Sequence, residues 1–206
     1  MPDMQLEVNA GGIVAGVDEV GRGSWAGPVV AAAVILDRTK LTQYLKEEID
    51  DSKRLTAKRR RKVTECLTEC SLMGTGAASN KEIAQLNILG ATYLAMKRAI
   101  FALPKLPDIA LVDGNQLPKL PCAAQCVVKG DSKSLSIAAA SIIAKVTRDK
   151  IMTKLAFQYP GFGWERNAGY GTPQHRMALE ELGVTRHHRN TFAPIINILR
   201  QSRKNT

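Results

Sequence analysis

Short apolar runs alternate along the chain with longer segments whose apolar residues recur at helical spacing. The short runs are rich in Val, Ile and Ala and are bounded by Gly, Pro or charged residues, which is typical of buried strands. We expect strands at residues 13–17, 28–36, 72–78, 109–112 and 125–128. We expect helices at about residues 56–70, 86–103, 136–157, 173–183 and 195–200. A helix that leads into a buried strand is typical of a parallel crossover, so the pattern predicts an α/β fold.

The same pattern predicts the domain organisation. Residues 1–12 form a loose lead-in, about 13–157 the α/β core, and about 158–206 a helical C-terminal portion. No internal repeat, low-complexity segment or linker interrupts the sequence. A chain of 206 residues is long enough for one well-packed core, so we expect a single domain over residues 1–206.

The net charge says more about the partners of the protein than its overall composition does. There are 29 Lys and Arg against 19 Asp and Glu, which gives a net charge of +10 and a pI near 9.6. Such an excess favours a polyanionic partner, either nucleic acid or an acidic membrane surface. The basic run at residues 58–62 is either a solvated helix face or a nucleic-acid contact surface. No apolar run is long enough to span a membrane and residues 1–12 lack signal-peptide features, so we expect a cytoplasmic protein.

The four cysteines form two pairs, each spaced by four positions: Cys66 with Cys70, and Cys122 with Cys126. The spacing resembles half of a zinc site, although structural zinc pairs usually stand two to four residues apart in turns. Cys66 and Cys70 instead share helical register with neighbouring apolar residues. We therefore expect core thiols rather than a zinc site or disulfides.

Acidic residues stand at the ends of three predicted strands. Asp18 and Glu19 follow the first strand, Asp113 the fourth and Asp131 the fifth. Ligands bind beyond the carboxyl ends of strands in α/β sheets, so these side chains can converge although they lie far apart in sequence. The alternative at each single place is an ordinary acidic turn, in which the carboxylate caps the backbone.

Four converging carboxylates would repel one another unless a cation were bound. Oxygen ligands select hard ions, so we expect Mg²⁺ or Mn²⁺ as the cofactor. With a phosphodiester substrate the expected task is to activate water and stabilise the leaving oxygen, by one ion or by two about 4 Å apart. Gly21 and Gly23 lie just beyond the first two acids and lack Cβ atoms, so the backbone there can approach a ligand closely.

Eight segments stand in an order and spacing that is highly specific when taken together. They read GVDEVGRG at 16–23, DSKRL at 51–55, NILGAT at 87–92, LVDGN at 111–115, VVKGDSKS at 127–134, AASIIAKVTRD at 139–149, GY at 169–170 and HRNTFAP at 188–194. On these segments the chain closely resembles bacterial ribonuclease HII, from residue 12 to about residue 194.

The resemblance implies an RNase H-like fold with a mixed central sheet flanked by helices, and a metal-dependent endonuclease. The implied reaction is cleavage of the RNA strand in RNA–DNA hybrids and nicking at single ribonucleotides in duplex DNA, leaving a 3′-hydroxyl and a 5′-phosphate. The family's catalytic, metal-binding carboxylates match Asp18, Glu19, Asp113 and Asp131.

The resemblance also implies substrate contacts. Gly21, Arg22 and Gly23 match the loop that reads the 2′-hydroxyl, the group that separates RNA from DNA. Tyr170 matches the tyrosine that packs on the sugar at the RNA-to-DNA junction, with a place in the core as the alternative. The expected phosphate contacts are Ser52, Lys53, Lys129, Lys145, Arg148 and Arg189.

The chain departs from the family pattern beside these contacts. Ser24 and Trp25 stand where a proline often follows the glycine loop. Ala168 stands where a lysine usually precedes Gly-Tyr, and Arg166 is a candidate to supply that charge.

Three further polar residues of the matching motifs are expected to be structural. Asp149 is expected to pair with Lys145 or Arg148, or to end a helix turn. His175 and His188 are expected to form structural hydrogen bonds, because metal-bound water needs no histidine base nearby.

Two competing interpretations are weaker. A basic nucleic-acid binder without catalysis gains nothing from acids placed near phosphates. Ribonuclease HIII or a transposase-like enzyme would share the catalytic fold, but the lead-in before residue 13 is too short for the extra N-terminal domain of ribonuclease HIII. We expect a monomer that acts on RNA–DNA hybrids and ribonucleotide-containing duplex DNA, with no membrane association and no protein partner evident.

Overall fold

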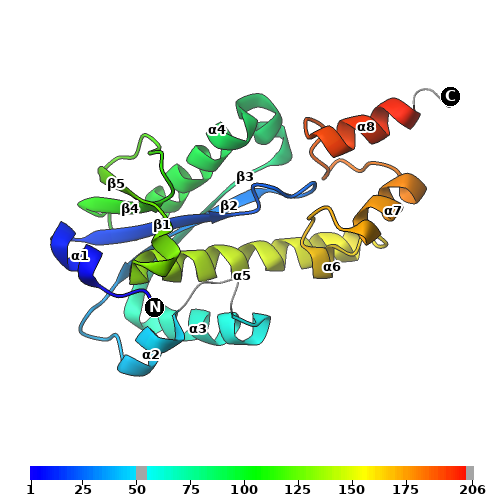
Figure 1. Ribbon diagram of the computed structural model, residues 1–206. Helices are drawn as coiled ribbons and strands as arrows, with labels where there is room; N and C mark the ends of the chain where they lie inside the picture. Colours follow the sequence, from blue (N-terminus) through cyan, green and yellow to red (C-terminus); the bar gives the residue numbers. More distant parts are fainter. Residues whose placement is uncertain (50–54, 203–206) are drawn as a thin grey trace.

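A five-stranded mixed sheet runs through the molecule in the order β3-β2-β1-β4-β5 (Figure 1). The computed structural model describes residues 1–49 and 55–202. In the antiparallel part, β1 (Val14–Val20) pairs with β2 (Val29–Leu36), and β2 pairs with β3 (Ser71–Ala78). In the parallel part, β1 pairs with β4 (Ile109–Asp113), and β4 pairs with β5 (Ala123–Val127). The predicted mixed sheet is therefore confirmed.

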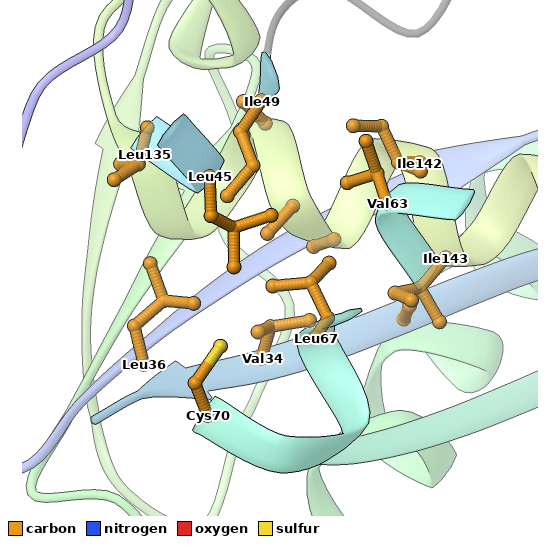
Figure 2. Close-up of a cluster of buried hydrophobic side chains, with 14 of the residues drawn as sticks. Val34, Leu36, Leu45, Ile49, Val63, Leu67, Cys70, Leu135, Ile142 and Ile143 are labelled. Carbon is orange, nitrogen blue, oxygen red and sulfur yellow. The ribbon is translucent and has the colours of Figure 1, made fainter. Parts of the chain in front are cut away.

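One face of the sheet is covered by α5 (Leu135–Gln158), which packs against both β1 and β2. Outside it lie α2 (Gln43–Glu48) and α3 (Ala57–Cys70), as Figure 1 shows below the sheet. Figure 2 shows the apolar cluster between these layers, with Leu67 and Cys70 of α3 facing Val34 of β2. Burial of these side chains holds the helical layer against the sheet that carries the predicted acids.

The other face is covered by α4 (Asn80–Phe101). This helix lies so close to β3 that a Cβ atom added at Gly74 would stand 2.2 Å from the carbonyl oxygen of Ala99. Inside α4, Asn87 has a φ of 56°, and its side-chain oxygen accepts hydrogen bonds from the amides of Leu89 (2.9 Å) and Gly90 (3.1 Å). The predicted helix of residues 86–103 is thus the second of two helical pieces joined at Asn87.

Three helices follow α5: α6 (Trp164–Asn167), α7 (Pro173–Leu182) and α8 (Ala193–Ser202). They enclose a separate apolar cluster around Trp164, to which Met152 and Leu155 of the last turns of α5 also belong. α7 begins as its sequence predicts, because the Thr172 hydroxyl accepts a hydrogen bond from the amide of His175 and proline takes the first turn.

The prediction of a loose lead-in at residues 1–12 is wrong. The segment contains α1 (Gln5–Ala10), whose Glu7 is buried. Glu7 Oε1 accepts hydrogen bonds from the hydroxyls of Ser134 (2.6 Å) and Ser136 (2.7 Å) and from the Ser136 amide (2.8 Å). A polar anchor of this kind leaves no apolar periodicity in the sequence, so pattern analysis misses it.

The prediction of core thiols is confirmed for Cys70, which is buried. Cys66 and Cys122 are half-buried, and each packs against an apolar cluster on one face of the sheet, while Cys126 is half-buried; all four thiols are free. Within residues 1–49 and 55–202, no helix is long and apolar enough to cross a lipid bilayer.

Candidate active site

Four predicted carboxylates converge at the carboxyl ends of the parallel strands. Val17 of β1 stands opposite Val112 of β4, so Asp18 and Asp113 both lie one step further along. Asp131 follows β5 in the short 3-10 helix η1 (Gly130–Ser132). One pocket of about 470 Å³ is lined by Asp18, Glu19, Val20, Asp113, Asp131, Ser141, Lys145 and Tyr170. The sheet topology therefore brings together acids that are separated by as much as half of the sequence.

Asp18 and Glu19 lie inside β1, not beyond the end of the first strand as predicted. Successive side chains of a strand point to opposite faces, so the two carboxylates leave the strand in different directions. Asp18 is buried and hydrogen-bonds to the side chain of Ser141 on α5. Glu19 reaches the α4 side, where it also lines a hollow with Leu89 and Thr92. The strand end thus gives the pocket two carboxylates with different surroundings.

Electrostatic repulsion is strong in this pocket. The pKa of Asp18 is raised well above its usual value, first by burial and then by the charges of Glu19 and Asp113. Burial also raises the pKa of Glu19, while the guanidinium of Arg22, 3.4 Å from Glu19 Oε1, opposes the shift. At neutral pH these acids are costly neighbours unless a cation compensates them.

The donor set fits a hard divalent cation. All four acids offer oxygen ligands, which suit Mg²⁺ and Mn²⁺. Among the described residues, no group of three or more Asp, Glu, His or Cys side chains already stands arranged to hold an ion. Instead the carboxylates bind amides: Asp18 Oδ1 accepts from the amide of Glu19, and Asp113 Oδ1 from the amide of Gly130, each at 2.7 Å. Backbone amides therefore hold two of the four carboxylates in place.

Gly130 is a site residue that sequence reasoning missed. A Cβ atom there would stand 2.6 Å from Ile137 Cδ1 and 3.2 Å from Asp113 Oδ1. The preceding residue, Lys129, has a φ of 55° and is exposed. This tight backbone turn sets η1, and with it Asp131, beside Asp113. The VVKGDSKS motif contains the glycine, but nothing in that motif identifies its contact with Asp113.

The glycine loop and Tyr170 lie side by side. A Cβ atom added at Gly23 would come within 4.0 Å of Tyr170 Cε1. The Tyr170 side chain is 38% exposed, so a core position is excluded. Behind it, Trp25 contacts Gly171, where an added Cβ atom would stand 2.1 Å from the indole ring. Trp25, which departs from the family pattern, thus packs against the segment that carries Tyr170 and supports it.

Two predicted phosphate contacts need correction. Arg148 is 0% exposed and Arg189 1% exposed, and both guanidiniums donate to backbone carbonyls. Neither reaches the surface where a phosphate would lie. Lys129 is exposed and Lys145 lines the pocket, whereas the predicted contacts Ser52 and Lys53 lie outside the described residues.

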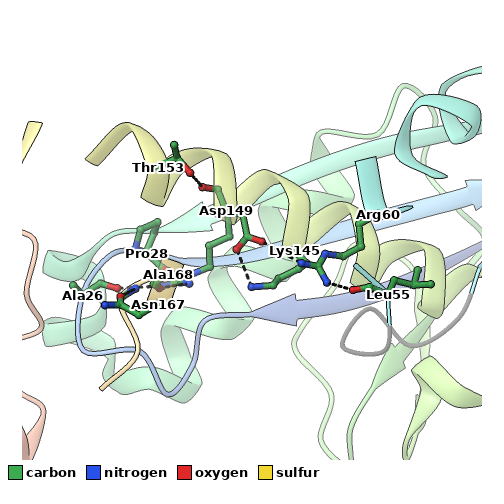
Figure 3. A network of polar contacts seen from close by, with 11 residues as sticks. Ala26, Pro28, Leu55, Arg60, Lys145, Asp149, Thr153, Asn167 and Ala168 are labelled. Carbon is green, nitrogen blue, oxygen red and sulfur yellow. Dashed lines mark hydrogen bonds and ion pairs between the residues drawn. The ribbon is translucent and has the colours of Figure 1, made fainter. Parts of the chain in front are cut away.

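Asp149 pairs with Lys145 Nζ at 2.8 Å and with Arg60 Nη2 at 3.7 Å, which confirms the pairing with Lys145. Arg148, the other partner considered for Asp149, turns instead to the carbonyls of Ala26, Pro28 and Ala168 (Figure 3). Asp149 therefore belongs to a charge network beside the pocket.

His175 and His188 form a buried hydrogen-bonded chain, as predicted for structural residues. His188 Nδ1 accepts from the amide of Thr185 (2.9 Å), so its proton is on Nε2 and is donated to His175 Nε2 (3.0 Å). His175 then carries its proton on Nδ1, 2.9 Å from the carbonyl oxygen of Tyr170. Burial lowers the pKa of His188 to about 3 and also lowers that of His175, so both rings are neutral. The chain fixes the backbone of Tyr170.

Ala168, which stands where the family usually has lysine, contributes through its backbone. Ala168 is buried with a φ of 49°, and its carbonyl accepts a hydrogen bond from Arg148 Nη1. Arg166, the candidate for the missing charge, stands 3.5 Å from Glu165 and donates to Gln174. It is not among the residues that line the pocket.

Comparison with known proteins identifies the family of this chain. The family model of ribonuclease HII matches residues 15–195. The chain belongs to the ribonuclease HII family. It is 59% identical to the ribonuclease HII of Granulibacter bethesdensis over 201 residues, which cover 97% of this chain and 92% of that relative.

Solved structures agree with this family and with the RNase H-like fold. The ribonuclease H2 of Pyrococcus horikoshii OT3 matches with a TM-score of 0.79 and 31% identity, over 93% of this chain and 99% of that one. The ribonuclease HII of Archaeoglobus fulgidus, solved as a complex with PCNA, matches with a TM-score of 0.74 and 25% identity, over 90% and 96%. Ribonucleases HII are endonucleases that cleave RNA in RNA–DNA hybrids and at single ribonucleotides, and they typically depend on divalent metals.

We expect Asp18→Asn to stabilise the metal-free protein. Ionisation of Asp18 in the folded state is disfavoured, so its contribution to stability falls as the pH rises from its ordinary pKa through the raised one. At neutral pH in EDTA, removing the charge should raise the melting temperature by roughly 2–4 °C, equivalent to about 1 kcal/mol. Adding Mg²⁺ or Mn²⁺ should then stabilise the wild type more than the variant.

Asp37→Asn is the matched control, because hydrogen bonds from Thr39 lower the pKa of Asp37 and its charge stabilises the fold. Thermal unfolding of this control should show no gain in EDTA and an unchanged response to metal. A lower melting temperature for Asp18→Asn in EDTA, or the same metal response as the wild type, would contradict the electrostatic account.

Proposed function

We propose that Asp18, Glu19, Asp113 and Asp131 hold Mg²⁺ or Mn²⁺ and form the catalytic centre of this ribonuclease HII. The observation that carries the proposal is the convergence of four carboxylates on one pocket in a chain of net charge +10. Repulsion among these acids gives a divalent ion a reason to bind there. When bound, such an ion supplies water activation and charge stabilisation at the phosphate.

The protein's own groups set the geometry of the reaction. The Gly130 amide orients Asp113, Ser141 orients Asp18, and Arg22 restrains Glu19. Lys145 lines the same pocket and supplies positive charge for the scissile phosphate. The products of this arrangement are a 3′-hydroxyl and a 5′-phosphate.

Substrate choice rests on the loop of Gly21, Arg22 and Gly23 together with Tyr170. Backbone amides in this loop bind the 2′-hydroxyl of the ribonucleotide, and the Tyr170 ring packs on the sugar at the junction. Its 38% exposure beside Gly23 supports this role. The resulting nick lies on the 5′ side of a single ribonucleotide, which suits ribonucleotide removal and RNA primer removal in the cytoplasm.

Asp113→Asn tests the catalytic assignment. The substitution should lower cleavage of a duplex with one ribonucleotide by about a thousandfold or more, because several kcal/mol of transition-state stabilisation are lost. Binding of the same duplex should change little, since the affinity comes from phosphate contacts. Gel analysis of cleavage and fluorescence anisotropy of binding measure the two effects.

Asp108→Asn is the control for this test, because Asp108 precedes β4 at its opposite end and an amide oxygen there can still accept from the amide of Ile13. It should keep wild-type cleavage. Full activity of Asp113→Asn would refute the site assignment, and loss of binding in step with cleavage would show that the variant damages the fold.

A basic groove between α3 and α5 supplies a second contact with the duplex backbone. The groove, of about 400 Å³, is lined by Arg60, Arg61, Lys150 and Lys154, with Asp149 as its acidic member. Asp149 also pairs with Lys145 of the active-site pocket, so the groove and the pocket are neighbours along α5 (Figure 3). This supports the interpretation of the run at residues 58–62 as a nucleic-acid surface.

Replacing Arg61 and Lys154 by alanine should weaken duplex binding without sequence preference. Each lost phosphate contact makes the negative slope of log affinity against log salt shallower by about 1, so the slope of the double variant should be shallower by about 2. Titrations at several salt concentrations measure the slope. Lys97→Ala with Lys105→Ala, exposed positions on the α4 side, is the matched control and should keep the wild-type slope. An unchanged slope in the first double variant would exclude the groove from the interface.

We propose that the protein acts as a monomer on RNA–DNA hybrids and on ribonucleotide-containing duplex DNA. One pocket carries all four carboxylates, which supports a complete site within one chain. The Archaeoglobus fulgidus relative has been solved with PCNA, so a sliding-clamp partner is a candidate for this chain.

A further inference from the structure

Two buried arginines lie directly behind the glycine loop. Arg148 comes from α5 and Arg189 from the segment before α8, and both side chains are fully buried. Among the described residues, neither guanidinium is paired with a carboxylate. Burying a cation without a counter-ion is costly, so hydrogen bonds must compensate it.

The compensation comes from backbone carbonyls, five of them between residues 21 and 28 and one at Ala168. Arg189 donates from Nη2 to Gly21 (2.6 Å), from Nη1 to Arg22 (2.8 Å) and from Nε to Gly27 (2.9 Å). Arg148 donates to the carbonyls of Ala26 (3.1 Å), Pro28 (2.9 Å) and Ala168 (2.8 Å). The two planar guanidinium groups thus bind six carbonyl oxygens in total. The pKa of Arg189 is lowered to about 9 by burial and then by the charge of Arg148, which still leaves it protonated at neutral pH.

The bonds from Arg189 determine where the loop amides point. In a trans peptide the carbonyl and the following N–H point in opposite directions. With the carbonyls of Gly21 and Arg22 turned inward to Arg189, the N–H groups of Arg22 and Gly23 are turned outward. Neither amide donates to another residue in the described part of the chain.

Arg148 links the same loop to Tyr170. Its guanidinium carbon lies 5.6 Å from the centre of the Tyr170 ring, and its Nη1 holds the carbonyl of Ala168 two residues earlier. Gly21 packs against Arg148 so closely that an added Cβ atom would stand 2.1 Å from Nε. The φ of +91° at Gly21 is a further reason for glycine there.

We propose that Arg148 and Arg189 are positioning residues that fix the outward amides of the glycine loop and the Tyr170 ring in one geometry for recognition of a 2′-hydroxyl. This inference rests on the proposed role of the loop. A guanidinium is required because its planar fork addresses several carbonyls at fixed angles, whereas a lysine ammonium is a point charge on a flexible stem.

Arg189→Lys tests the proposal. Affinities are measured in the Asp113→Asn background for two duplexes that differ only in one 2′-hydroxyl. The ratio of the two dissociation constants reports recognition of that hydroxyl. Arg189→Lys should bring this ratio towards 1, because the amides lose their alignment. In the otherwise wild-type enzyme, it should also lower kcat/KM on the single-ribonucleotide duplex by about a hundredfold.

Arg98→Lys is the matched control. Arg98 also donates to a backbone carbonyl, that of Ala77 (2.7 Å), and pairs with Glu82, but it lies on α4 away from the loop. It should lose stability while keeping the affinity ratio. Hydrogen exchange provides a second readout: the amides of Trp25 and Gly27, which donate to the carbonyls of Gly169 (2.8 Å) and His187 (2.9 Å), should exchange faster in Arg189→Lys while those of β2 stay protected.

Each outcome decides the matter. An unchanged ratio in Arg189→Lys, or equal weakening of both duplexes, would overturn the positioning role. If Arg189→Lys does not fold, Arg148→Lys replaces it, because it releases the carbonyls of Ala26 and Ala168 in the same network, and the same criterion applies. If the protein with both arginines intact shows no preference for the ribonucleotide, the proposed function of the loop fails instead.

Discussion

The mutual repulsion of acids on neighbouring parallel strands is the constraint on which this structure depends. Asp18 and Asp113 follow directly paired residues of β1 and β4, so the sheet itself holds them together. Burial and the neighbouring charges raise the pKa of Asp18. A fold that keeps such an arrangement gives up stability at the strand ends, and under the proposed function the binding of a divalent ion offsets the loss. The apolar clusters on both faces of the sheet hold the strand ends in place, so the acids cannot move apart to relieve their repulsion.

A second group of buried charges, which are positive, lies behind the glycine loop next to the acidic pocket. Arg148 and Arg189 are buried cations, and their compensation is a set of backbone carbonyls rather than carboxylates. Under the proposed function, anionic side chains thus face the site of hydrolysis, while cationic side chains shape the backbone that recognises the sugar. The neutral His175–His188 chain adds a third support by holding the carbonyl of Tyr170. The proposed chemistry and the proposed recognition of the sugar therefore rest on separate buried polar networks.

Much of the fold follows from local patterns, because buried strands and amphipathic helices leave periodic signals in sequence. The convergence of Asp18, Asp113 and Asp131 was predictable from acids at strand ends. Arg148 and Arg189 were not, because charged residues are expected at the surface. One signal existed: Arg148 lies four residues from both Ala144 and Met152, which are buried on the same face of α5. The anchor made by Glu7 and the turn at Gly130 depend on contacts between distant segments, which no local pattern encodes.

The most direct test of the central claim is cleavage of a DNA duplex that contains a single ribonucleotide, with Mg²⁺, with Mn²⁺ and with EDTA. The account predicts one nick on the 5′ side of the ribonucleotide, with a 3′-hydroxyl end, only when a divalent ion is present. An all-DNA duplex of the same sequence should remain intact. Cleavage in EDTA, equal cleavage of the all-DNA duplex, or no cleavage in either metal would contradict it.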